Sequence, residues 1–309
     1  MAEQTSVEGV EHQLRGLRTR LEEKYGPLRG RIELEARVSP NLHEIGGLEK
    51  AKLEIEGLGH AFRDPALQKR WGTKTSRAIL LYGPPGTGKS LLASALALRA
   101  EAALVLLRMA CMLLRWQDQS PVLLRDLLNG LEGAGRVVLF LDELDALHQE
   151  RLRLVTSDAA RGMMFAFLLV FLDDLEYREE YLVVASTNRP DSIHPDFVRP
   201  GRFDRLIEMT LPSPEEQRVI LEIHKARAEA IAGRPLFQAL DYPPLLKRIE
   251  GLSGADLAEV IRRALEDKMR LEARGDRPDL VSTEDLIREA EVFRRIKVVG
   301  ERIRTGQYL

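Results

Sequence analysis

Residues 78–90 read AILLYGPPGTGKS, and the two halves of this stretch predict different local structures. The first five residues form a short apolar run, which is typical of a strand buried in a parallel sheet. Residues 83–90 have the pattern G-x-x-x-x-G-K-S, and an apolar segment of helical character follows them. A strand, a glycine-rich loop and a helix in this order predict a phosphate-binding P-loop rather than a glycine-rich surface turn.

The residue types of this loop suit a phosphate group. Glycines let backbone N–H groups face an anion without interference from a Cβ atom, and the positive end of the following helix attracts the same anion. Lys89 is expected to reach the β- and γ-phosphates of a nucleotide, and the Ser90 hydroxyl is expected to ligate Mg²⁺. The other residues predicted to contact the nucleotide here are Gly83, Pro84, Pro85, Gly86, Thr87, Gly88 and Leu91.

Further apolar runs indicate the architecture around the loop. They span residues 103–107, 137–141 and 181–186, and helical patterns occupy 89–100, 121–132 and 158–175. Alternating strands and helices predict a doubly wound α/β layer with a parallel sheet and helices on both faces, over residues 41–211. After Pro212 the patterns are helical only, at 215–231, 244–250, 254–273 and 283–296. They predict a small all-helical domain over residues 212–300, followed by a flexible tail at 301–309.

The first 40 residues are predicted to form a short helix and a linker. Apolar residues recur at the a and d positions of a heptad for about two heptads; they are Val7, Val10, Leu14, Leu17 and Leu21. A coiled coil and an amphipathic helix docked on a neighbouring surface both fit so short a pattern. Gly26 and Pro27 end the predicted helix, and residues 27–41 are interpreted as the linker.

Composition narrows the function classes. The chain has 309 residues, with 46 basic and 48 acidic side chains and a net charge of −2. This balance argues against nucleic acid or an anionic membrane as a partner. The most apolar run, residues 162–172, is shorter than the roughly 20 residues of a membrane span, so it predicts a buried helix. The single cysteine, Cys111, is interpreted as a buried thiol, and a cytoplasmic location is expected because the N-terminus has no apolar signal-peptide core.

Acidic and polar residues follow two of the predicted strands. Asp142 and Glu143 come directly after the run 137–141. This is typical of a Walker B motif, in which Asp142 would hold Mg²⁺ through water and Glu143 would orient the attacking water. An acidic helix N-terminus is the alternative. Asn188 follows the run 181–186, at the edge of the sheet where ligands bind, and is interpreted as a contact to the γ-phosphate or the water.

Two arginines, Arg202 and Arg205, lie in the segment RPGRFDRLIEM, residues 199–209. The planar donor fork of a guanidinium fits the oxygens of a phosphoryl group in transfer. An arginine supplied by a neighbouring subunit is one known source of this contact. A surface Arg–Asp pair is the alternative interpretation.

Six segments together resemble the AAA family of ATPases, in the order of its motifs. They are IGGLEKAK (45–52), GPPGTGKS (83–90), LFLDELD (139–145), STNRPDSI (186–193), RPGRFDR (199–205) and GLSGADLAEV (251–260). The resemblance covers residues 40–296 and points to the AAA clade proper. It implies an ATPase core with a four-helix lid, assembled as a homo-oligomeric, usually hexameric ring that binds ATP and Mg²⁺ at subunit interfaces.

The resemblance also implies roles for individual residues. Glu143 would be the catalytic carboxylate and Asn188 the residue called sensor 1, while Arg202 and Arg205 would point into the site of the next subunit. Ile45 and Gly46 would contact the adenine. Gly254 and Ala255, with Asp256, would form the lid element that approaches the nucleotide.

One segment departs from the family pattern. Ring unfoldases of this family have a pore loop of aromatic, hydrophobic and glycine residues where this chain reads LLRWQDQS, residues 113–120. Trp116 supplies the aromatic ring, but Gln117 and Asp118 replace the other two residues. Trp116 is therefore either a pore-loop residue that grips a polypeptide or a side chain that packs locally.

The last four residues, Gly306, Gln307, Tyr308 and Leu309, are similar to the tail of the bacterial proteasome-associated ATPases. That resemblance implies docking on a proteasome core particle through an aromatic ring and a terminal carboxylate; a frayed stub is the alternative. Those ATPases carry a long coiled coil and β domains before the ATPase, whereas about 40 residues precede it here. The expected function is a minimal ATPase that unfolds or translocates protein substrates. A remodeller without proteolysis and a nucleotide-gated proteasome cap remain open, and a DNA remodeller is disfavoured by the net charge.

Overall fold

The computed structural model describes residues 2–36, 39–148 and 156–304. The chain forms two compact units. Unit 1 comprises the chain up to residue 42 together with residues 49–84 and 89–209. Unit 2 comprises residues 43–48, residues 85–88 and the chain from residue 210 onward. The P-loop segment therefore contributes residues to both units.

Unit 1 is built on a six-stranded sheet with the strand order β1-β3-β4-β5-β2-β6. The strands are β1 (Ile32–Glu35), β2 (Ala78–Tyr82), β3 (Ala103–Arg108), β4 (Val137–Asp142), β5 (Tyr181–Thr187) and β6 (Arg205–Glu208). All neighbouring pairs are parallel except β1 and β3, which are antiparallel. The four predicted strands are the central ones, and they are buried along nearly their whole length, as strands covered on both faces should be.

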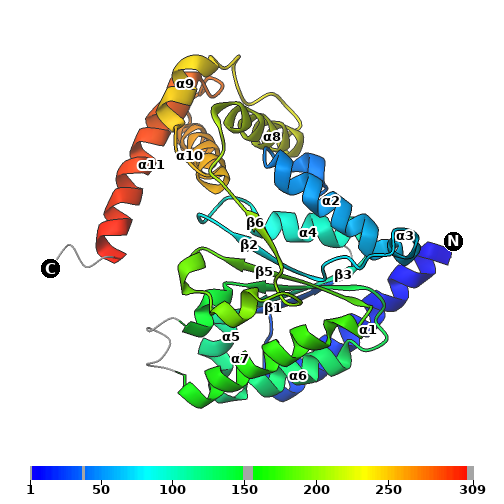
Figure 1. Cartoon of the computed structure of the whole chain (residues 1–309). Coiled ribbons are helices and arrows are strands. Elements are labelled where there is room, and N and C mark those ends of the chain that lie inside the picture. Colours follow the sequence, from blue (N-terminus) through cyan, green and yellow to red (C-terminus); the bar gives the residue numbers. More distant parts are fainter. Residues whose placement is uncertain (1, 37–38, 149–155, 305–309) are drawn as a thin grey trace. The chain divides into compact units, whose positions relative to one another are not determined.

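Helices cover both faces of this sheet (Figure 1). On one side lie α2 (Glu49–Arg63) and α4 (Lys89–Arg99), and on the other lie α1 (Ala2–Tyr25), α6 (Ser120–Gly130) and α7 (Asp158–Asp173). The remaining helices of the unit are the short α3 (Pro65–Arg70) and α5 (Met109–Trp116). The predicted doubly wound α/β fold is confirmed, with the antiparallel β1 as an addition at one edge.

The N-terminal helix packs on unit 1 itself. Leu14, Leu17 and Leu21 of α1 are buried in the core of the unit. The contact with α6 is so close that a Cβ atom on Gly130 would lie 2.2 Å from Leu17 Cδ1. Of the two interpretations of the heptad pattern, the docked amphipathic helix is the one that the structure has. The linker prediction for residues 27–41 is wrong, because these residues include β1, which pairs with β3.

Two further expectations are corrected in unit 1. The apolar run at 162–172 lies in α7, which buries Met164 and Leu168 but leaves Met163 53% and Val170 60% exposed. This helix is therefore apolar on both sides and buried on only one. Cys111, predicted to be buried, is partly exposed. Among the described residues, no helix is long and apolar enough to cross a membrane.

Unit 2 is helical, as predicted. Its described α-helices are α8 (Pro214–Ala232), α9 (Tyr242–Ile249), α10 (Gly254–Ala273) and α11 (Thr283–Arg304), which surround their own apolar core. Capping boxes start two of them, with Ser213 and Glu216 at α8 and Ser253 and Asp256 at α10. Each box satisfies backbone N–H groups that a helix start would otherwise leave without partners.

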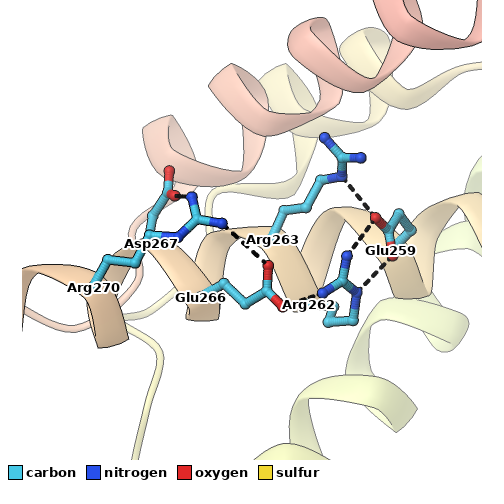
Figure 2. Close-up of polar contacts among 6 residues, drawn as sticks. All are labelled: Glu259, Arg262, Arg263, Glu266, Asp267 and Arg270. Atoms are coloured by element: carbon cyan, nitrogen blue, oxygen red, sulfur yellow. Dashed lines mark hydrogen bonds and ion pairs between the residues drawn. The ribbon is translucent and has the colours of Figure 1, made fainter. Parts of the chain in front are cut away.

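A ladder of ion pairs runs along α10 (Figure 2). Both oxygens of Glu259 accept hydrogen bonds from Arg262, each at 2.7 Å, and Arg263 donates a third at 2.7 Å. The guanidinium of Arg262 is the larger cause that lowers the pKa of the Glu259 carboxyl to about 2. Arg262 also pairs with Glu266, and Arg270 pairs with Glu266 and Asp267.

This ladder leads to a stability prediction. Glu259→Gln is expected to lower the free energy of unfolding at pH 7 by about 0.5–1 kcal/mol, since water screens ion pairs at a helix surface. The folded-state pKa is depressed, so the contribution is present above pH 4.5 and is lost as pH falls toward about 2. Urea unfolding at pH 7 and pH 4 checks this, and the deficit should shrink at pH 4. Glu272→Gln, which breaks an exposed pair of 4.0 Å with Arg234, is the control and should change little.

Candidate nucleotide site

The P-loop leaves β2 at Tyr82 and reaches α4 at Lys89. Gly83 has a φ of +141°, and a Cβ atom there would lie 2.1 Å from the Met209 carbonyl oxygen. Only glycine fits at this position, because both the dihedral angle and the close backbone exclude a side chain. The start of the loop, at Gly83, is therefore held at the carboxyl end of β2.

Lys89 is buried at the start of α4. Its Nζ donates hydrogen bonds to the carbonyl oxygens of Gly83 at 2.9 Å and Pro84 at 2.8 Å. Burial lowers the pKa of Lys89 to about 8, although the charges of Asp142 and Asp145 act in the opposite direction. Phosphate oxygens are stronger acceptors than these carbonyls, so the ammonium group is suited to exchange its partners for a phosphate.

The carboxyl ends of β4 and β5 bring acidic and hydroxyl groups together. Asp142 Oδ1 accepts a hydrogen bond from Ser186 Oγ at 2.5 Å, and the same Oγ accepts one from the Glu143 backbone N–H at 3.2 Å. Thr187 Oγ1 donates to Asp145 at 2.8 Å. Ser186 and Thr187 are not among the residues that the sequence patterns predict for the site. Their position at the end of a buried strand, directly before Asn188, could have indicated them.

Glu143 has an unusual backbone conformation. Its φ is +58°, in the left-handed region that residues other than glycine rarely adopt. The hydrogen bond to Ser186 helps to hold the strained backbone there, and such strain is often concentrated at functional sites. Glu143 is only partly buried, and Asn188, just past β5, is exposed. Solvent therefore reaches both residues at this edge of the sheet.

The Ser90 hydroxyl and the Asp142 carboxylate fit the predicted magnesium site. Both are oxygen donors, which Mg²⁺ prefers, and Ser90 is exposed at the first turn of α4. Over the described ranges, no group of three or more His, Cys, Asp or Glu residues could hold a metal ion. A nucleotide-bound Mg²⁺ does not require such a group, because it takes one or two protein ligands and completes its shell with phosphate and water.

Unit 2 holds other predicted nucleotide contacts. Gly46 packs against α8, where a Cβ atom would lie 2.5 Å from Ile220 Cγ1, and Ile45 is buried. The Leu48 backbone N–H donates to Glu216 Oε1 at 2.8 Å, which fixes the end of the 43–48 segment. At the start of α10, the Ala255 N–H donates to the Gly86 carbonyl at 3.1 Å, beside Gly254. Glu216 is a residue that sequence reasoning missed.

Both predicted arginine fingers form ion pairs within unit 1. Arg202 binds both carboxylate oxygens of Asp173, at 2.7 and 2.8 Å, and its Nη1 donates to the Asp196 carbonyl at 2.8 Å. This contact lowers the pKa of Asp173 below its usual range. Arg205 pairs with Glu54 of α2. Each arginine thus has an acidic partner far away in the sequence.

The pore-loop prediction for Trp116 is wrong for this structure. Trp116 is the last residue of α5 and is buried in the core of unit 1. Its indole Nε1–H donates to the Tyr25 carbonyl oxygen at 2.8 Å, which fixes the end of α1. The local-packing alternative is the correct one, because the indole satisfies its polar group as well as its apolar surface there. The predicted docking residues Gly306, Gln307, Tyr308 and Leu309 lie outside the described residues.

The fold and the P-loop define a nucleotide-binding α/β protein of the P-loop class. Residues 79–211 match the sequence model of the ATPase family associated with various cellular activities (AAA). The chain therefore contains an AAA ATPase domain, as its motifs predicted.

Several relatives of known name are similar to most of the chain. The proteasome-activating nucleotidase of Aeropyrum pernix is 34% identical over 272 residues, which are 87% of this chain and 63% of the relative. The ATP-dependent zinc metalloprotease FtsH 2 of Sphaerobacter thermophilus is 34% identical over 79% of this chain and 36% of its own length. The cell division cycle protein 48 homolog of Archaeoglobus fulgidus is 34% identical over 84% of this chain and 34% of its own. The chain thus spans between about a third and two thirds of these relatives.

Proposed function

We propose that this chain is a Mg²⁺-dependent ATPase and a subunit of a homo-oligomeric ring, with a hexamer as the expected form. The main observation in favour of ATPase activity is the cluster of polar and charged side chains at the carboxyl ends of β2, β4 and β5. There the charges of Asp142 and Asp145 act on Lys89, while Ser186 ties Asp142 to the backbone of Glu143. This arrangement combines a cation for phosphate, an oxygen ligand for the metal and a carboxylate for water.

Each residue has a distinct part in the proposed hydrolysis. Lys89 and the backbone N–H groups of the P-loop would hold the phosphates, while Ser90 and Asp142 would hold Mg²⁺, which supplies charge neutralisation when bound. Glu143 would accept a proton from the attacking water, and Asn188 would orient that water or the γ-phosphate. Arg202 and Arg205 would stabilise the charge that develops on the phosphoryl group of a neighbouring subunit.

An apolar stripe on α7 supports assembly with a second copy of the chain. Met163 and Val170 are exposed on this helix, Phe167 between them is only partly buried, and Asp173 follows on the same exposed side. Asp173 binds Arg202, so the end of this helix face contacts an arginine that is proposed to act on the neighbouring subunit. Large apolar side chains in a row on one helix face favour an interface over free exposure.

The proposed substrates are proteins, and the proposed partner is a proteasome core particle in the cytoplasm. Two observations support this part: the similarity to a relative named proteasome-activating nucleotidase, and the resemblance of the last four residues to a docking tail. The burial of Trp116 favours a second candidate. Without that aromatic ring in a pore, the chain fits an ATPase that remodels a complex, or caps the proteasome, without threading polypeptide by this residue.

A binding comparison tests the proteasome part. The full chain, with ATP, is expected to bind a proteasome core from the same organism, and a chain lacking Tyr308 and Leu309 is expected to lose binding. Six tails on one ring would add their weak contacts, so the loss should be large. Co-sedimentation measures it, and the truncated chain must keep its ATPase rate. If neither form binds while ATP hydrolysis is intact, the remodelling function is the one to pursue.

A further inference from the structure

Within unit 2, the P-loop residue Gly86 is hydrogen-bonded to the start of α10 and packs closely against it. Its carbonyl oxygen accepts the Ala255 backbone N–H at 3.1 Å. A Cβ atom on Gly86 would lie 2.5 Å from Ser253 Oγ and 3.0 Å from the Ala255 Cβ, so there is no free space between the two segments. Because close-packed groups transmit displacement, a change in the position of Gly86 must displace the first turn of α10.

The carboxylate of Asp256 connects the first turn of α10 to α11. Asp256 Oδ2 accepts the Ser253 backbone N–H at 2.9 Å, which is half of the capping box, and it also accepts the Lys297 ammonium group at 2.7 Å. The Asp256 side chain is 13% exposed and that of Lys297 is 40% exposed. The same oxygen thus belongs both to the helix start beside the P-loop and to the contact with α11.

Lys297 lies beyond the last residue of α11 that packs against the apolar core of unit 2. The first half of the helix buries Leu286 and Ala290 in the core of unit 2. Phe293 still packs against this core as a partly buried side chain, and from residue 294 to 299 the described side chains are exposed. Arg294 donates to the Glu250 carbonyl oxygen, and Lys297 binds Asp256. Beyond Phe293, polar contacts rather than burial therefore set the position of α11.

We propose that Lys297 couples the occupancy of the P-loop to the second half of α11. This inference rests on the proposed binding of ATP. Phosphate bound by the P-loop backbone restricts Gly86, which restricts Ala255 and Asp256, and Asp256 then holds Lys297 more firmly. Lys297 is a positioning residue here and needs no contact with ATP.

Amide hydrogen exchange of the full chain tests this, with and without a non-hydrolysable ATP analogue and Mg²⁺. In the wild type, the analogue is expected to slow exchange at residues 291–299 by about two- to fivefold, the range that an exposed ion pair supplies. Lys297→Met keeps the aliphatic stem and should remove this response, while its affinity for the analogue stays within about fivefold of the wild type. Fluorescence titration of a labelled analogue measures that affinity.

Lys268→Met is the matched control. Lys268 also joins α10 to α11, through Asp285 at 2.7 Å, but it lies away from the P-loop contact. This variant should keep the full response at residues 291–299. An equal response in Lys297→Met, an equal loss in Lys268→Met, or a wild type that binds the analogue without any response in α11 would each overturn the inference alone. A wild type that fails to bind the analogue would overturn the proposed function, and this inference with it.

Discussion

Glu143→Gln is expected to bind ATP as tightly as the wild type and to hydrolyse it about 10²–10⁴-fold more slowly, the range for loss of a general base. Glutamine has nearly the shape of glutamate but cannot accept the proton from water. The hydrogen bond from the Glu143 backbone to Ser186 does not involve the side chain, so the local structure should persist. Phosphate release measures turnover, and titration with a labelled ATP analogue measures affinity.

A carboxylate elsewhere on the surface provides the control for this change. Glu176 pairs with Lys74 at an exposed position and has no predicted role. Glu176→Gln should hydrolyse ATP at the wild-type rate. Wild-type turnover in Glu143→Gln would remove Glu143 from the catalytic role, and loss of ATP binding would show that its charge matters for the ground state instead.

Arg202→Ala is expected to lose about 10³-fold or more in turnover, the effect of removing an arginine that stabilises phosphoryl transfer. The same change also breaks the contact with Asp173, so slower turnover alone would leave two explanations. Mixing Arg202→Ala subunits with Glu143→Gln subunits distinguishes between these two explanations. Arg202→Ala subunits have an intact Glu143, and Glu143→Gln subunits have an intact Arg202, so a mixed ring contains some complete sites.

The mixture of the two inactive variants is therefore expected to recover part of the wild-type ATPase rate. Arg199→Ala, in which an exposed arginine three residues earlier loses its pair with Asp196, should stay active when measured alone. Recovery in the mixture would place Arg202 in the site of a neighbour. If the mixture stays as inactive as its components, Arg202 acts within its own chain, through the loop that it joins to α7.

Contiguous residues were enough to predict the centre of the fold and much of the candidate site. The run 78–90 specifies a strand, a loop and a helix start by local rules, because apolar length, glycine dihedral freedom and the helix terminus all act within a few residues. The same holds for 137–143, where a buried strand ends in two acids. The edge strands β1 and β6 were missed because IELE and RLIE are short and partly polar, so only their neighbours in the sheet select the strand conformation.

The sequence by itself thus determined the P-loop, the strands that carry it, and the identity of the candidate catalytic residues. Only the tertiary structure decided that Trp116 is buried under Tyr25, that Arg202 lies against Asp173, and that Lys297 reaches Asp256. The physical reason is the distance along the sequence over which each effect acts. Backbone conformation responds to side chains within a turn or a strand, whereas a tryptophan or an ion pair takes its partner from whichever distant segment the packing of the whole unit brings beside it.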